Sequence, residues 1–159
     1  MNAELVALIN SIADLVGMEV ADVRDEHERW KVYVPATDSD ESSELLLRAV
    51  RLEPDPNVAL SIVLRKLEWI SDSDRQSWID QLVTDKQRDY ATRRARDLKV
   101  LETRPLAPAL HQGIDESWSD WLQVRLAEFS PEPEVACWLS QHGRTKRIRR
   151  LALERTKKL

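Results

Sequence analysis

Glycine, cysteine and the smaller aromatic residues are scarce in this chain of 159 residues, which holds three glycines, one cysteine, one phenylalanine and two tyrosines. Tight β-hairpins need residues that accept positive φ, so the shortage of glycine argues against a fold rich in hairpins. The single cysteine, Cys137, cannot form an internal disulfide and has no second thiol with which to bind a metal. We therefore expect helices, and a reducing cytoplasm suits the chain.

Long apolar runs are also missing. No run approaches the roughly 20 residues that span a bilayer, and the first residues include Glu4 but no basic leader. We therefore expect neither a membrane span nor a secretion signal. The composition is 42% hydrophobic and 33% charged, which is typical of a globular helical protein with a well-solvated surface.

The formal net charge of −4 conceals an uneven distribution along the chain. Residues 1–80 carry 17 acids and 8 bases, whereas residues 81–159 carry 11 acids and 16 bases. The acidic and basic halves could pair within the molecule, favour self-association, or present a basic face to an acidic partner. Composition does not choose among the three.

Apolar spacing predicts an all-α fold of about seven helices, either an irregular helical bundle or a short helical repeat array. Predicted helices include 2–16, ended by Gly17, and 56–69, in which Pro56 follows the capping residue Asp55. Further helices are predicted over 84–103, 115–129 and 131–142 and after Thr145, whereas alternation of apolar and polar residues allows a short strand at 30–34.

Prolines and a glycine mark the best candidate for an internal division. Residues 105–114 contain Pro105, Pro108 and Gly113, which predict a loop or linker. It would separate an amino-terminal helical region, 1–104, from a carboxyl-terminal region, 115–159, that ends in a basic helix. We expect the two regions to form one compact unit, because single domains commonly reach roughly 150 residues.

Two segments of the chain are similar to each other. Residues 40–59 read DESSELLLRAVRLEPDPNVA and residues 115–136 read DESWSDWLQVRLAEFSPEPEVA. Each predicts an acid-capped helix, a break marked by proline, and a second helix. Either the chain contains a duplication, or helices started by proline look alike by chance, since Asp-Pro and Ser-Pro are common caps.

The last segment, PEPEVACWLSQHGRTKRIRRLALERTKKL, resembles one HEAT-type helical repeat: a helix, a short turn, and a second helix with an IRRLAL pattern. The resemblance covers residues 131–159, and the turn carries Gly143, Arg144 and Thr145 where the family usually has an aspartate. It implies a stacked helical surface that binds proteins without catalytic chemistry.

Motifs for catalysis and for metal binding are not found in the sequence. The three histidines do not stand at ligand spacing with one another or with Cys137, and no GxGxxG, P-loop, GxSxG or HExxH pattern occurs. We therefore predict no catalytic residues, no metal, no cofactor and no enzymatic activity.

Tryptophan and arginine provide the candidate binding residues. Four of the six tryptophans lie on predicted apolar faces, which leaves Trp30 and Trp121 as predicted partner-binding anchors. The alternative is contact with nucleic-acid backbone through basic residues. Candidates for that contact are Arg93, Arg94, Arg96, Arg144, Lys146, Arg147, Arg149 and Arg150.

Helices without recognisable chemistry favour a non-catalytic interaction module or adaptor subunit of a cytoplasmic complex, bound to a protein partner that the sequence does not identify. The alternative is an accessory subunit that contacts nucleic-acid backbone through the basic carboxyl-terminal helix. For that helix, solvation and docking on the acidic half of the chain also stay open, as does self-association.

Overall fold

The computed structural model describes residues 1–103, 105–106 and 118–159, and this part of the chain contains nine helices and no strand. The all-α prediction is confirmed, although the described residues alone hold more helices than the expected number of about seven. No described helix is both long and apolar enough to cross a membrane. The helices are α1 (Ala3–Val16), α2 (Glu26–Thr37), α3 (Ser43–Leu52), α4 (Pro56–Lys66), α5 (Asp72–Ile79), α6 (Asp85–Glu102), α8 (Asp120–Phe129), α9 (Pro133–His142) and α10 (Lys146–Thr156).

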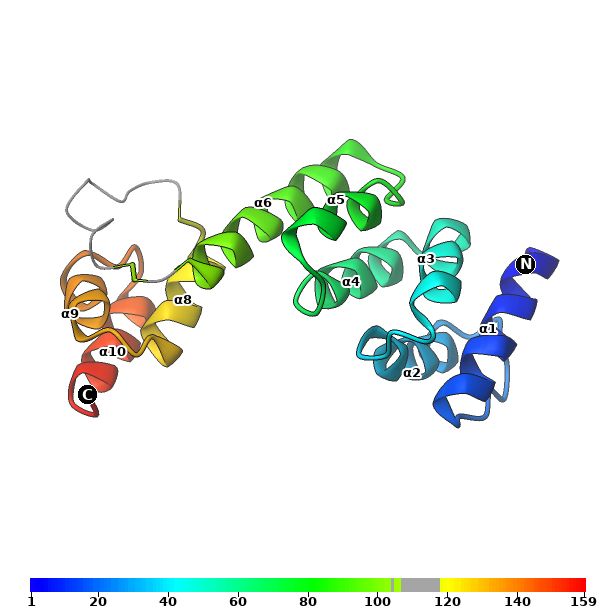
Figure 1. Cartoon of the computed structure of the whole chain (residues 1–159), viewed down its shortest axis with the longest axis horizontal. Coiled ribbons are helices and arrows are strands. Elements are labelled where there is room, and N and C mark those ends of the chain that lie inside the picture. The colour runs from blue at the N-terminus through cyan, green and yellow to red at the C-terminus, as the bar shows by residue number, and fades with distance from the viewer. Residues whose placement is uncertain (104, 107–117) are drawn as a thin grey trace. The chain divides into compact units, whose positions relative to one another are not determined.

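The chain divides into two compact units, Met1–Ala95 and Arg96–Leu159, with the boundary inside α6. We call them the amino-terminal unit and the carboxyl-terminal unit (Figure 1). Of the predicted linker 105–114, only Pro105 and Leu106 fall within the described residues.

The possible strand at 30–34 is wrong, because these residues lie inside α2. A strand would place Tyr33 on the face opposite Val32, but both side chains are fully buried, and Ala36 follows one helical turn after Val32. The helix starts cleanly because the Asp25 carboxylate accepts the His27 N–H at 2.8 Å. Burial on one helical face therefore outweighs the local alternation.

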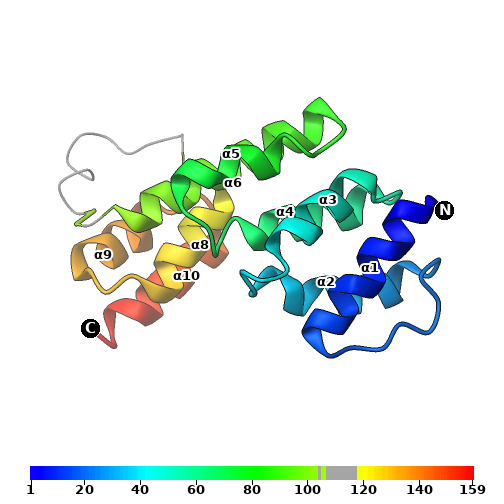
Figure 2. The same cartoon turned by 45° about the vertical axis from the view of Figure 1, so that its right-hand side comes forward.

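Alternate helices pack side by side in the amino-terminal unit (Figures 1 and 2). Helix α1 packs against α2 and α3, and α2 packs against α3 and α4. Helix α1 ends at Gly17, as predicted, where φ is +67°. The buried side chains at the centre of these four helices include Leu5, Ile9, Ile12, Val32, Tyr33, Leu46, Val50, Ile62 and Val63.

Buried cations fix the carboxyl ends of two helices in this unit. Lys66 Nζ donates to the Thr37 carbonyl at 3.0 Å, at the end of α2, and Arg75 Nε donates to the Leu67 carbonyl at 3.1 Å, just after α4. Carbonyls at a helix end have no partner in the helix, and the helix dipole favours a cation there. Burial lowers the pKa of Lys66.

The carboxyl-terminal unit is built on α8, α9 and α10, each packed against the other two. Helix α9 begins at Pro133 rather than at the predicted Pro131, because Ser130 still closes α8 by donating its N–H to the Leu126 carbonyl. Thr145 caps α10 as predicted, with Oγ1 3.2 Å from the Ile148 nitrogen. The core of the unit comprises Leu106, Trp118, Leu122, Leu126, Ala127, Val135, Leu139, Ile148 and Ala152.

The two similar sequence segments form comparable helix pairs. Helices α3 and α8 are each 10 residues long, and the helices that follow them, α4 and α9, each begin with a proline. Residues 115–117, at the start of the second segment, lie outside the described residues. The duplication stays a prediction.

Candidate functional site

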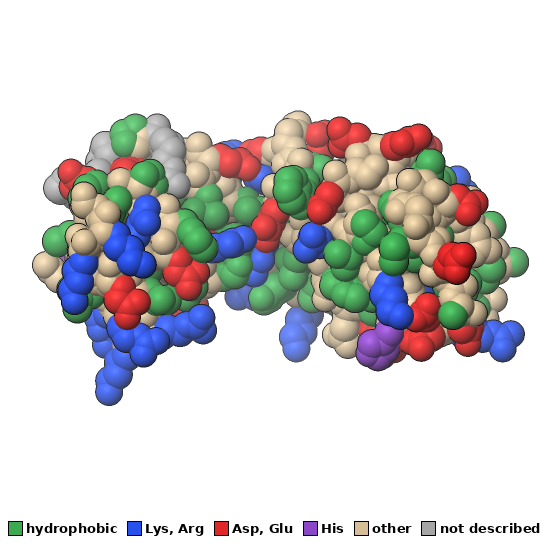
Figure 3. Space-filling view, turned by 90° about the horizontal axis from the view of Figure 1, so that it is seen from below, with side chains coloured by type: hydrophobic (Ala, Val, Ile, Leu, Met, Phe, Trp, Pro, Cys, Tyr) green, Lys and Arg blue, Asp and Glu red, His purple; other side chains and the backbone are tan. Residues whose placement is uncertain are grey.

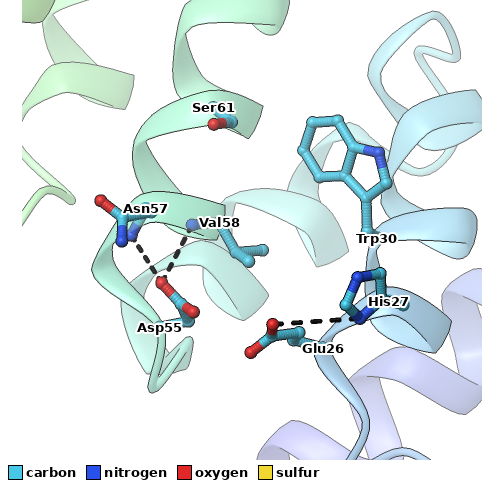
Figure 4. Close-up of a pocket in the computed structure, with 7 residues that line it drawn as sticks. All are labelled: Glu26, His27, Trp30, Asp55, Asn57, Val58 and Ser61. Carbon is cyan, nitrogen blue, oxygen red and sulfur yellow. Dashed lines mark hydrogen bonds and ion pairs between the residues drawn. The ribbon is translucent and has the colours of Figure 1, made fainter.

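A groove between α2 and the start of α4 is the candidate site. Its volume is about 380 Å³. Side chains from α2 form one wall, and side chains from α4 and its capping residue form the other (Figure 4). The lining residues are Glu26, His27, Trp30, Asp55, Asn57, Val58 and Ser61.

Both helices begin at the groove, and each start is fixed by an aspartate cap. Asp55 Oδ1 accepts the N–H groups of Asn57 at 2.8 Å and Val58 at 3.3 Å. Asp25 Oδ1 holds the His27 N–H in the same way, and this hydrogen bond lowers the pKa of Asp25. Capping therefore determines where each wall starts.

Each wall of the groove contributes one carboxylate, Glu26 or Asp55. Glu26 lies on the α2 side and Asp55 on the α4 side (Figure 4). The side chain of His27 is 81% exposed, and its Nδ1 lies 3.9 Å from Glu26 Oε1. Neither lysine nor arginine is among the described residues that line the groove.

Trp30 provides the aromatic surface of the site. Its side chain is partly buried, and the indole ring stands on the α2 side of the groove, at the level of Ser61 on α4 (Figure 4). Trp30 is thus one of the two predicted anchors, and the structure places it in a groove. A partly exposed tryptophan in a concave site offers a large, rigid contact area.

A buried ion pair connects α2 with the turn before α4, and so joins the two walls of the groove. Glu53, between α3 and α4, accepts hydrogen bonds from Arg29 of α2, at 3.0 Å from Nε and 2.7 Å from Nη2. Glu53 also accepts the Tyr33 hydroxyl at 3.0 Å and the Asp55 N–H at 3.1 Å. The Arg29 and Glu53 side chains are only 3% and 0% exposed, so the pair is shielded from water.

The ionisation of this network follows from its burial. Hydrogen bonding to Glu53 raises the pKa of Arg29, and burial raises the pKa of Tyr33 well above its usual value. Arg29 Nη1 also donates to the carbonyls of Val23 and Arg24, which lie just before α2. One guanidinium therefore holds the segment before α2 and the turn before α4 together.

The second predicted anchor, Trp121, lies on α8 in the carboxyl-terminal unit. It is partly buried against the core of that unit, and the Arg125 guanidinium carbon lies 5.3 Å from its ring centroid. Trp30 and Trp121 thus belong to different units. Trp121 is not among the residues that line the groove between α2 and α4.

The predicted basic residues on α6 belong to both units: Arg93 and Arg94 to the first, Arg96 to the second. Arg93 is exposed, and its guanidinium carbon lies 5.8 Å from the Tyr90 ring centroid. The Arg94 side chain is only 11% exposed, with Nη1 4.0 Å from Glu68 Oε1. Arg94 is therefore poorly placed to contact a phosphate.

The basic residues at the carboxyl end fall into two groups. Arg144 and Arg149 bond within the carboxyl-terminal unit: Arg144 donates to the Asp120 carboxylate and the Trp118 carbonyl, and Arg149 donates to the Gly143 carbonyl. Figure 3 shows basic side chains gathered on one face of this unit. The exposed bases of α10 and the residues just after it are Lys146, Arg147, Arg150, Lys157 and Lys158.

Sequence reasoning missed most of the groove. Asp55 was recognised as a cap, but Glu26, Asn57, Val58 and Ser61 carried no functional prediction. The available signal was the pair of aspartate caps, Asp25 and Asp55, each at the start of a helix. Only the packing of α2 on α4 shows that these two starts face the same groove.

No protein-family model, curated protein or solved structure matches this chain. Among the described residues there is also no group of three potential ligands that could hold a metal ion.

Proposed function

We propose that this chain is a non-catalytic protein–protein interaction module, an adaptor subunit of a cytoplasmic complex that binds its partner through the groove between α2 and α4. The observation that carries the proposal is Trp30, a partly buried tryptophan in a groove bordered by exposed polar groups. Protein interfaces combine an aromatic anchor with a polar rim in this way.

The packing of the amino-terminal unit supports the same function. Helices α1 and α3 lie side by side, as do α2 and α4, which is the neighbour relation expected of stacked helical pairs such as HEAT-type repeats. Stacked pairs form extended concave surfaces that bind proteins. The groove is formed by one such pair of neighbours, α2 and α4.

A site-specific photocrosslink tests the proposal. The photoreactive residue p-benzoylphenylalanine replaces Ser61, which is exposed in the groove, or Gln76, which is exposed on α5 and does not line it. Irradiation in the native cytosol should give discrete protein adducts from position 61 that position 76 does not give. The Trp30→Ala variant should lose these adducts, because it removes the aromatic anchor.

Trp69→Ala is the matched control, since Trp69 is 63% exposed and does not line the groove. It should leave the position-61 adducts unchanged. The proposal fails if position 61 gives no adduct, if both positions give the same adducts, or if the two tryptophan variants behave alike. Circular dichroism of each variant checks that the helices are retained.

The exposed bases of α10 favour a second candidate, contact with nucleic-acid backbone. Lys146, Arg147 and Arg150 are all exposed and recur at one- and four-residue spacing, so they share one side of the helix. Three phosphate contacts on duplex DNA would make affinity fall by about 40-fold between 50 and 200 mM salt. A filter-binding titration over this range measures the change.

Changing these three residues to alanine should abolish that binding. Changing Lys31, Arg48 and Arg51, three exposed bases of the amino-terminal unit, removes the same charge and should leave it intact. Absence of binding at 50 mM salt, or equal loss in the two triple variants, would rule this candidate out.

A further inference from the structure

We infer that the groove between α2 and α4 binds the guanidinium group of an arginine on a basic segment of the partner protein. This inference rests on the proposed function, because it names the chemistry of the partner at the same groove. Three features carry it: the carboxylates on the two walls, the position of Trp30, and the rigid link between the walls.

The two carboxylates that line the groove favour a cationic ligand. Glu26 lies on the α2 side and Asp55 on the α4 side, and neither lysine nor arginine is among the described residues that line the groove with them. Asp55 uses Oδ1 to cap α4, which leaves Oδ2 directed to the groove (Figure 4). A cation in the groove would therefore find carboxylates on both walls and no competing cation of the protein.

The net charge of the whole amino-terminal unit also favours a cationic ligand. Residues 1–95 carry 19 acids and 12 bases, a formal charge of −7. Figure 3 shows many acidic side chains on the face of this unit that is visible there. A negative surface of this kind raises the local concentration of basic segments and speeds their association.

Trp30 selects arginine among the possible cations. A guanidinium is planar and weakly hydrated, so it can stack on an indole ring while its edge donates paired hydrogen bonds to carboxylates. The ammonium group of lysine lacks the planar fork that this combination requires. The chain contains the same arginine–tryptophan contact elsewhere, where the Arg125 guanidinium carbon lies 5.3 Å from the Trp121 ring centroid.

The walls hold their positions without the ligand. Glu53 binds Arg29 on the α2 side and the Asp55 N–H on the α4 side, and the resulting ion pair is buried. The distance between Trp30 and Asp55 is thus set by a buried network and not by the ligand. A preformed site retains more of its interaction energy as affinity.

Fluorescence anisotropy with a pair of peptides tests the inference on the full chain. The first probe is a fluorescein-labelled, alanine-rich nonapeptide with arginine at three alternate positions, and the second carries citrulline at the same positions. Citrulline preserves the shape of arginine but removes its charge. Wild-type protein should bind the arginine peptide at least about tenfold more tightly than the citrulline peptide.

The groove variant is Glu26→Gln combined with Asp55→Asn, in which asparagine still caps α4. Its control must lose the same charge, so it combines Glu44→Gln with Asp74→Asn. Both control positions are exposed acids in the first turns of α3 and α5, and neither lines the groove. The groove variant should bind the arginine peptide at least about tenfold more weakly, whereas the control should stay within about twofold of wild type.

Equal binding of the two peptides, or equal weakening in the groove variant and its control, overturns the inference. So does absence of arginine-peptide binding at low salt. If groove adducts still form in the photocrosslinking experiment, such a result rejects the cationic ligand alone and leaves the interaction module standing. If the adducts are also absent, the proposed function fails with it.

Discussion

Replacing Glu53 by glutamine should strongly destabilise the amino-terminal unit. Glu53 Oε2 accepts Arg29 Nε and the Tyr33 hydroxyl, and Oε1 accepts Arg29 Nη2 and the Asp55 N–H. A glutamine amide nitrogen cannot accept a hydrogen bond. In either orientation of the amide, the variant loses one hydrogen bond from Arg29 and one from a neutral donor.

The size of the expected loss of stability in Glu53→Gln follows from the burial of the ion pair. Two buried donors without acceptors cost about 1–3 kcal/mol each, and breaking a buried ion pair from one side costs about 3–5 kcal/mol. The pair is nearly inaccessible, with side chains 3% and 0% exposed, so water cannot replace the lost partner. We therefore expect Glu53→Gln to lower the free energy of unfolding by about 3–5 kcal/mol, a large part of the about 5–15 kcal/mol typical of a domain.

Urea denaturation followed by circular dichroism at 222 nm measures this change. Glu4→Gln is the matched control, because it neutralises one partner of an ion pair with Arg48 whose side chains are 52% and 53% exposed. That pair should contribute less than about 1 kcal/mol. If Glu53→Gln is as mild as Glu4→Gln, the buried network does not connect the two walls of the groove as described.

Three further predictions concern stability. Because burial raises the pKa of Tyr33, the folded chain keeps the phenol proton to higher pH than the unfolded chain does. The stability that the buried, protonated phenol contributes is complete below pH 10 and is lost above it. The free energy of unfolding of Tyr33→Phe relative to wild type should therefore be about 1.4 kcal/mol higher at pH 11 than below pH 10. Urea titrations of both proteins below pH 10 and at pH 11 measure this difference. Gly143→Ala should destabilise the protein by more than the about 1–2 kcal/mol expected for Gly17→Ala. At Gly143 the new Cβ would lie 2.6 Å from the Leu139 carbonyl oxygen, whereas at Gly17 it meets no atom within 4 Å and only the positive φ is strained. Thermal unfolding of both variants compares the two costs. Asp55→Ala should lose about 1 kcal/mol and Asp55→Asn much less, since asparagine also caps a helix; thermal melts of the two should differ accordingly.

Helix boundaries were predictable where a local signal acts alone. Gly17 ends α1 and Pro56 starts α4, because positive φ and the missing proline N–H are properties of single residues. The segment 30–34 was not predictable in this way. Its alternation fits a strand, and only tertiary burial of Val32 and Tyr33 together makes it a helix.

The groove was beyond local reasoning for a different reason. Trp30 was recognised by its residue type, but its neighbours belong to α4, which the chain reaches only after α3. Nor could spacing show that Arg94 and Arg144 are committed to partners within their own units. A sequence does not distinguish an exposed arginine from one that is bonded to a partner within its own unit.

The Glu53 carboxylate also bears on how a ligand would enter the groove. Because Glu53 is bonded to Arg29 of α2 and to the Asp55 N–H before α4, widening the groove would break a buried charged contact. Ligand and protein should therefore meet in a single bimolecular step, with an observed rate that rises linearly with peptide concentration and no slower isomerisation phase. Discrimination between ligands would then depend on dissociation, because a cleft that does not reshape itself admits good and poor fits equally fast and releases the poor fits sooner.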